Sequence, residues 1–152
     1  MRRAVPVLAL LVAACSAQQL GRKPPLPEPE VAIEQLSAVP VAARNVSGPL
    51  SVHYAVHVRN VAGQPITLKR IDLGTVGYGS YSVATQSRPF DATIEPGGES
   101  AVELWLPAQI VDPSLAGANG PVTIRAVLLF DSPAGQLQTS ITRQVRSATA
   151  PD

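Results

Sequence analysis

Two histidines, His53 and His57, are the side chains of this 152-residue chain whose type and spacing could most directly perform chemistry. On a helix, a spacing of four residues would place both imidazoles on one face, where they could share a metal ion. On a β-strand the same spacing separates them by about 13 Å, too far for a single ion. Because the residues that alternate with them are apolar, we expect a strand whose histidines face solvent and hold no metal.

The chain also contains serines and aspartates that could join a histidine in a nucleophilic triad. Ser51 or Ser80 would supply the nucleophile, and Asp72 or Asp91 would orient the imidazole. However, the sequence has no nucleophile elbow, no Ser-x-x-Lys string and no His-Glu-x-x-His string. We therefore predict that the protein is not an enzyme and uses no cofactor.

Aromatic residues offer a second kind of site. The glycine-rich residues 74–81 lack the Gly-Lys-Ser/Thr of a phosphate loop, but Tyr78 and Tyr81 could present flat rings and hydroxyls to a glycan or a partner. The interpretation we favour is a bent edge strand or hairpin with one tyrosine packed inward. Trp105 is either an exposed anchor at an interface or, as we favour, a tryptophan that covers the rim of a sandwich before Pro107.

The longest connection expected in the chain is formed by residues 107–121, whose prolines and glycines suit no regular structure. Long loops in compact domains are often functional, but this one could equally be a crossover between two sheets. Its apolar residues Ile110, Val111 and Leu115 follow no period that would commit them to a core, so they are candidates for contact with a partner.

The single cysteine, Cys15, ends the string Val12-Ala13-Ala14-Cys15 after an apolar run that two arginines precede. This is the general plan of a secretory signal, and the string resembles the lipobox of bacterial lipoproteins. The resemblance implies cleavage before Cys15 and a diacylglycerol on its sulfur. Ser16, in place of an aspartate, resembles the class sent to the outer membrane, so we expect a lipid-anchored protein that faces the periplasm.

Two other interpretations of this N-terminal segment are a plain secretory signal and a membrane-spanning helix. The apolar residues 4–14 are too few for a span, which needs about 20 residues. The plain secretory signal therefore remains as the alternative to the lipoprotein signal.

Charge and length bound the rest of the chain. Without residues 1–14, ten basic and eleven acidic side chains remain, so no nucleic-acid partner is expected. With no second cysteine for a disulfide, the domain must be held together by its core. We predict a signal peptide at residues 1–14, a lipidated cysteine and proline-rich linker at 15–30, one folded domain at 31–146 and a disordered tail at 147–152.

Alternation of apolar and polar residues is the main structural signal of residues 31–146. The alternation breaks phase between Lys69 and Arg70, as a β-bulge would cause. Val127 and Leu129 make their strand apolar on both faces, so that strand should be central in its sheet. Strands are expected at residues 31–36, 50–58, 66–73, 78–84, 90–94, 102–106, 122–130 and 137–145.

Short strands with one apolar face each, separated by Gly- and Pro-rich turns, predict an all-β fold: a single immunoglobulin-like antiparallel β-sandwich of about eight strands. The cysteine pair of antibody domains is absent. Residues 50–143 are similar to the late-embryogenesis-abundant sandwich, or water-stress domain, through Val58-Arg59-Asn60 and Glu95-Pro96-Gly97-Gly98-Glu99-Ser100. Where that family continues Asn-Pro-Asn, this chain has Asn60-Val61-Ala62-Gly63.

These observations lead to two expected functions. The first is a membrane-anchored envelope lipoprotein whose sandwich is a non-catalytic binding or scaffolding module, with the membrane and another envelope protein as its partners. The alternative is a stress-protective domain of the water-stress type that has no specific partner. In the first case the candidate contact residues are Tyr78, Tyr81, Trp105, Ile110, Val111 and Leu115.

Overall fold

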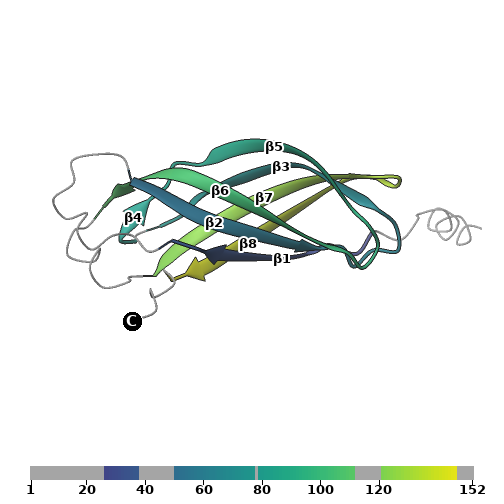
Figure 1. Cartoon of the computed structure of the whole chain (residues 1–152), viewed down its shortest axis with the longest axis horizontal. Coiled ribbons are helices and arrows are strands. Elements are labelled where there is room, and N and C mark those ends of the chain that lie inside the picture. Colours follow the sequence, from purple (N-terminus) through teal and green to yellow (C-terminus); the bar gives the residue numbers. More distant parts are fainter. Residues whose placement is uncertain (1–25, 38–49, 78, 112–120, 147–152) are drawn as a thin grey trace, which may run out of the picture.

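A computed structural model of the protein describes residues 26–37, 50–77, 79–111 and 121–146 (Figure 1). Within these ranges the chain forms eight β-strands and no helix, and hence no helix that could span a membrane. The strands are β1 (Glu30–Gln35), β2 (Leu50–Arg59), β3 (Ile66–Thr75), β4 (Tyr81–Ser82), β5 (Gln86–Ile94), β6 (Glu99–Ile110), β7 (Val122–Ser132) and β8 (Gly135–Val145).

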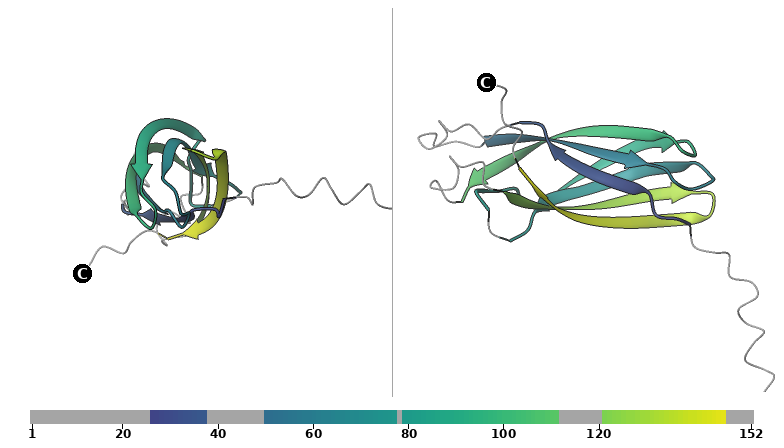
Figure 2. Two further views of the ribbon diagram at one scale, coloured as in Figure 1. Left: turned by 90° about the vertical axis from the view of Figure 1, so that its right-hand side faces the viewer. Right: turned by 90° about the horizontal axis from the view of Figure 1, so that it is seen from below.

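The eight strands form two four-stranded antiparallel sheets that enclose the core between them (Figure 2). One sheet has the order β1-β2-β6-β4 and is named here the β2–β6 sheet. The other has the order β5-β3-β7-β8 and is named the β3–β7 sheet. The prediction of an all-β sandwich of about eight strands in two antiparallel sheets is therefore confirmed.

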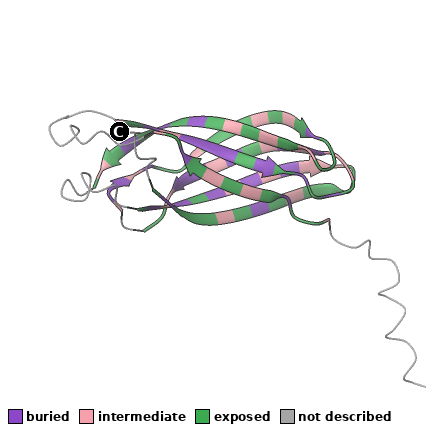
Figure 3. Ribbon diagram, turned by 60° about the horizontal axis from the view of Figure 1, so that its bottom comes forward, coloured by how far each residue is buried: buried purple, intermediate pink, exposed green. Residues whose placement is uncertain are grey.

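The core follows directly from the alternation in the sequence, and buried and exposed residues alternate along the strands (Figure 3). Each strand with one apolar face must bury that face against the other sheet, because removing apolar surface from water is the main favourable term in folding. The largest fully buried side chains come from β2, β3, β6 and β7: Val52, Tyr54, Val56, Val58, Ile66, Leu68, Ile71, Leu73, Leu106, Ile124, Leu128 and Phe130.

Strand β3 contains the expected irregularity. Its pairing with both β5 and β7 shifts register between Leu68 and Arg70. Against β7, Lys69 is the extra residue of a β-bulge, whereas against β5 the extra residue lies on β5. The shift returns Ile71 to the core after Leu68 and lets the two consecutive cations Lys69 and Arg70 stay at the surface. Strand β7 pairs with β3 on one side and β8 on the other, so its predicted central position is also confirmed.

A buried asparagine joins two turns at one end of the sandwich. The Asn60 side chain is fully buried; its amide nitrogen donates to the carbonyls of Gln64 and Ile94, and its oxygen accepts from the Ala62 N–H, all at 2.9 Å. The Asn60 backbone also bonds to the turn before β6, where Gly97 has φ +74. The Asn60 side chain therefore supplies hydrogen-bond partners to backbone groups of the turns that follow β2 and β5.

The structure departs most from the predicted strand boundaries at three places. Strand β5 begins at Gln86, before the strand expected at residues 90–94. Residues 107–110, expected to begin a long loop, continue β6 and pair with β2 and β4 instead. The strand expected at residues 78–84 shortens to the two residues of β4. Residues 112–120 of the expected loop lie outside the described residues, as do the predicted signal segment and Cys15.

Candidate binding face

The outer face of the β2–β6 sheet carries an exposed tryptophan together with both histidines and four glutamates. The antiparallel register sets these side chains in rows across β1, β2 and β6. In order along the sheet the rows are Glu30-Arg59-Glu99, Ala32-His57-Ala101, Glu34-Ala55-Glu103, His53-Trp105 and Ser51-Pro107. We name this surface the β2–β6 face.

Trp105 lies near the middle of this face, opposite His53 on the neighbouring strand. The two rings stack with centroids 4.0 Å apart and planes 11° from parallel. His53 Nε2 lies 2.9 Å from Glu103 Oε2, and because a carboxylate only accepts, this nitrogen carries the proton. Glu103 thus holds the imidazole in place by a hydrogen bond, and the imidazole covers one face of the indole by stacking on it.

The Trp105 side chain is nevertheless 58% exposed, the most exposed of the large hydrophobic residues in the described chain. Its position on β6 places it out of phase with the core residues Leu104 and Leu106, so it points away from the other sheet. The interpretation of Trp105 as a cover for the sandwich rim is therefore wrong. It is an exposed aromatic ring held in one orientation.

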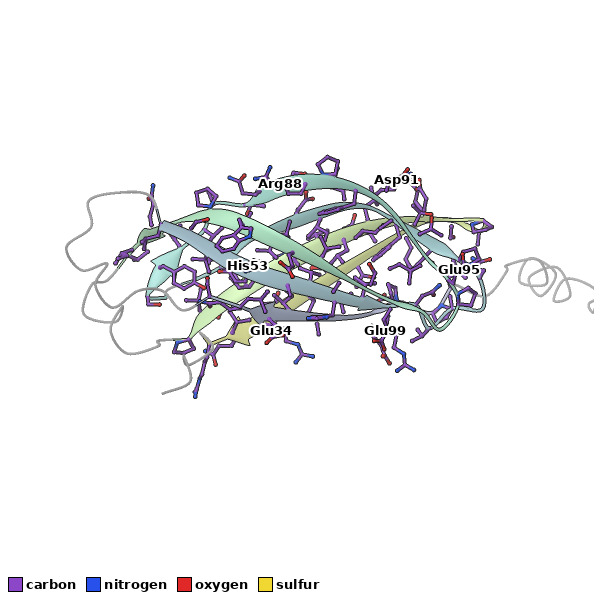
Figure 4. All side chains as sticks on the ribbon, viewed as in Figure 1. Glu34, His53, Arg88, Asp91, Glu95 and Glu99 are labelled. Atoms are coloured by element: carbon purple, nitrogen blue, oxygen red, sulfur yellow. The ribbon has the colours of Figure 1, made fainter. Side chains whose placement is uncertain are left out.

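A second imidazole–carboxylate contact lies two rows away, where His57 Nε2 is 3.7 Å from Glu34 Oε2. Beyond it, the Arg59 guanidinium lies 3.5 Å from Glu30 and 3.6 Å from Glu99. A shallow hollow of about 480 Å³ opens between these charged side chains, with Ala32 and Ala101 beside His57. Figure 4 shows Glu34 and Glu99 along this side of the sandwich and His53 on its broad face.

The geometry agrees with the interpretation of His53 and His57 as surface side chains. They share one face of β2, but each contacts a different glutamate. Among the described residues, no group of three or more histidine, cysteine or acidic side chains is placed to hold a metal ion. Asp72 and Asp91 belong to the opposite sheet, where Asp72 accepts from Ser87, so the core separates both from the histidines.

Tyr81, expected as a contact residue, is only 3% exposed and cannot present its ring to a partner. Its hydroxyl donates to Gln35 Oε1 at 2.6 Å and lies 2.7 Å from the Tyr54 hydroxyl, while Gln35 Nε2 donates to the Ser37 carbonyl. This inward packing from a short strand matches the interpretation favoured for the glycine-rich segment. Tyr78 lies outside the described residues.

Burial changes the acidity of both core tyrosines. Transfer of a phenolate from water into the core is unfavourable, which raises the pKa of Tyr81 to about 12. The pKa of Tyr54 is raised further, chiefly by burial and then by the charge of Tyr81 and the hydrogen bond to it. Both hydroxyls are therefore neutral at ordinary pH, and the pair is a structural link among β1, β2 and β4.

The other predicted contact residues lie at the end of β6. Ile110 pairs with Tyr81 of β4 and is half-buried, and Val111 is exposed while its N–H donates to the Ser80 carbonyl. Leu115 lies outside the described residues. Of the predicted contacts, the structure brings Trp105 into a cluster with side chains from a neighbouring strand, and it adds His53, Glu103 and Glu34, which the contact prediction lacked.

Away from this face, the exposed cation Lys69 pairs with Asp91 across β3 and β5. The hydrogen bond to Asp91 raises the pKa of the Lys69 ammonium.

The β3–β7 sheet carries five basic and three acidic residues, whereas the β2–β6 sheet carries four glutamates and one arginine. The two broad faces of the sandwich therefore differ in the sign of their charge.

Comparison with known proteins gives structural neighbours only. No protein-family model matches the chain, and no curated protein does. A solved protein from Archaeoglobus fulgidus is 12% identical with a TM-score of 0.48, covering 82% of this chain and 99% of its own. A protein from Arabidopsis thaliana is 16% identical with a TM-score of 0.46, covering 84% and 86%.

The neighbours also include a candidate late embryogenesis abundant protein, the family that residues 50–143 resemble. It is 16% identical with a TM-score of 0.46, and the match covers 80% of this chain and 73% of the other. We draw no functional conclusion from likeness at this level.

Proposed function

We propose that this protein is a lipid-anchored, non-catalytic binding module of the bacterial envelope whose partner contacts the β2–β6 face around Trp105. The observation that carries the proposal is the exposed indole, stacked on His53 and fixed through Glu103. Tryptophan is enriched among the residues that dominate binding energy at protein interfaces. A ring already held in one orientation loses little conformational entropy when a partner covers it.

The charge of the β2–β6 face specifies the chemistry of the partner. Glu34 and Glu103 lie in the row next to Trp105, and Glu30 and Glu99 line the hollow. Arg59 is the one arginine of these strands. A complementary surface would place basic side chains against these carboxylates and an apolar or cationic group over the indole. The proposed partner is therefore an envelope protein with a basic patch.

The anchor rests on the resemblance of the string ending in Cys15 to a lipobox. Two or three acyl chains hold a domain at a membrane stably, and the proline-rich residues that follow Cys15 would give the sandwich reach. To bind a partner at the membrane surface, the anchored domain then needs only a rigid exposed face. Replacing Cys15 with serine should abolish palmitate incorporation and release the protein from the membrane fraction with its melting temperature unchanged.

Quantitative crosslinking in the native envelope tests the proposed contact. The wild-type protein should yield one crosslinked species of defined mass, and Trp105→Ala should remove it. Arg125→Ala, an exposed change on the opposite sheet, is the matched control and should keep the species. The free energy of unfolding of each variant should lie within about 1 kcal/mol of the wild-type value, because both side chains are exposed.

The same experiment separates this proposal from the stress-protective alternative. A domain without a specific partner would give a diffuse set of crosslinked proteins that Trp105→Ala does not change. That result, with all variants folded, would contradict the proposed binding face.

A further inference from the structure

The two sheets leave four strands at their edges, namely β1, β4, β5 and β8. An edge strand has unpaired backbone N–H and C=O groups that can pair with a strand from another molecule. Proteins prevent this with very short edges, prolines, charged side chains or bulges. The four edges of this sandwich differ sharply in whether they carry such protection.

Three of the four edges are protected. Strand β4 has only two residues. Strand β5 contains Pro89 between Arg88 and Asp91, and its pairing with β3 is interrupted by a bulge on β5 itself. Figure 4 shows the two charged residues along this edge. Strand β1 is six residues long and begins with Glu30, with Glu34 near its other end.

Strand β8 lacks most of these protections. It has eleven residues and contains no proline, and its first eight residues, 135–142, carry no charge. Its pairing with β7 is continuous from Gly135 to Val145, with no shift of register. In the other layer β1 approaches β8 (Figure 2), but the two strands form no ladder, so no described strand is hydrogen-bonded to β8 on the side away from β7.

We infer that β8 pairs with β8 of a second copy of this chain, antiparallel about a two-fold axis through Ser140. A self-pairing strand must be complementary to its own reverse, and β8 meets this requirement. With the axis at its midpoint, all eleven residues pair. Its outward side chains then meet as Ser140 with Ser140, Gln138 with Thr142 and Gln136 with Gln144, each an uncharged pair able to form hydrogen bonds.

Charge does not oppose this register. The single charged residue of β8, Arg143, falls opposite Leu137 of the second copy. The two arginines are then six positions apart along the strand, about 20 Å, where screening leaves little repulsion. Pairing of the acidic edge β1 with itself would instead bring glutamates of two copies together.

The axis of such a pair runs perpendicular to the sheets, so it joins the two β3–β7 sheets into one sheet of eight strands. Both β2–β6 faces then point the same way. Two copies of Trp105 would be presented side by side, which raises the avidity for any repeated partner. The dimer itself rests only on the edges of the fold and does not depend on the proposed function.

Disulfide trapping tests the register directly. The full-length chain with Cys15→Ser and Ser140→Cys places its only thiol on the two-fold axis, within the Cα spacing that a disulfide needs. Thr142→Cys in the same background is the matched control, because its two copies would lie about 14 Å apart. We expect rapid oxidation of the first variant to a dimer and none of the second. Equal oxidation of the two would refute the register.

Sedimentation velocity tests the dimer without a crosslink. The wild-type sandwich should shift from monomer to dimer as its concentration rises toward about 1 mM, the weak range expected for a small interface. Ser140→Lys places two like charges opposite each other and should weaken the dimer at least about tenfold with the melting temperature unchanged. A wild type that stays monomeric throughout, or a Ser140→Lys dimer as tight as the wild type, would overturn the inference.

Discussion

Removal of the Tyr81 hydroxyl should destabilise the sandwich more than removal of the Tyr54 hydroxyl, although the two groups bond to each other. Tyr81 donates its single proton to Gln35, so the proton in the 2.7 Å contact between the tyrosines must come from Tyr54. The hydrogen bonds therefore run in one direction, from Tyr54 to Tyr81 to Gln35. Tyr81→Phe breaks two of them, whereas Tyr54→Phe breaks one.

The magnitude follows from what each substitution leaves unpaired. Tyr81→Phe leaves the Tyr54 O–H without an acceptor and the Gln35 oxygen without a donor, both in the interior. Each buried unpaired polar group costs about 1–3 kcal/mol, so the two together should cost about 2–6 kcal/mol. Tyr54→Phe leaves the bond from Tyr81 to Gln35 intact and should cost about 1 kcal/mol.

Urea unfolding of the two single variants and the double variant measures these costs. The double variant should lose less than the sum of the singles, because the unpaired hydroxyl that Tyr81→Phe creates is then absent. Equal denaturant slopes would show that the unfolded state is unchanged. A larger loss for Tyr54→Phe than for Tyr81→Phe would contradict this direction of the hydrogen bonds.

Two further predictions concern pH and the turns. Because the folded-state pKa values of Tyr54 and Tyr81 exceed the unfolded value of 10, stability should be complete below pH 10 and fall between pH 10 and 12, by up to about 1.4 kcal/mol per pH unit for each tyrosine. Thermal melts across this range should show a shallower fall for Tyr81→Phe; a flat profile in the wild type would contradict it. Asn60→Ala should cost about 3 kcal/mol in urea unfolding because three hydrogen bonds are lost inside the domain, and a cost below 1 kcal/mol would show that water replaces them.

The sequence allowed the layers of this fold to be predicted because its strands alternate clearly. Each feature that was predicted correctly depends on the sequence of one strand or turn. Examples are the apolar positions of β2 and β7, the phase break at Lys69 and the hairpin before β8. The end of β6 was missed because Pro107 was taken to end the strand. Proline is tolerated there because β6 has a neighbour on only one side before β4 begins.

The candidate binding face could be predicted only in part. Alternation along β6 showed Trp105 to be out of phase with its apolar neighbours, but its stacking on His53 depends on the register between two strands that lie about 50 residues apart in sequence. The bond from Tyr81 to Gln35 likewise joins strands that no single-strand pattern relates. Such contacts are set by the packing of the sheets and not by local sequence.

Site-specific photo-crosslinking in the native envelope tests the central claim, that the β2–β6 face binds a partner, most directly. A photoreactive residue at Ser51 or Ala101 samples this face on either side of Trp105 without removing a side chain of the proposed contact, and one at Arg125 or Val127 samples the opposite sheet. We expect one partner adduct from both positions of the β2–β6 face and none from the opposite sheet. Adducts of that partner from the β3–β7 sheet alone, or no discrete adduct from Ser51 and Ala101 in folded protein, would show that the partner does not bind this face.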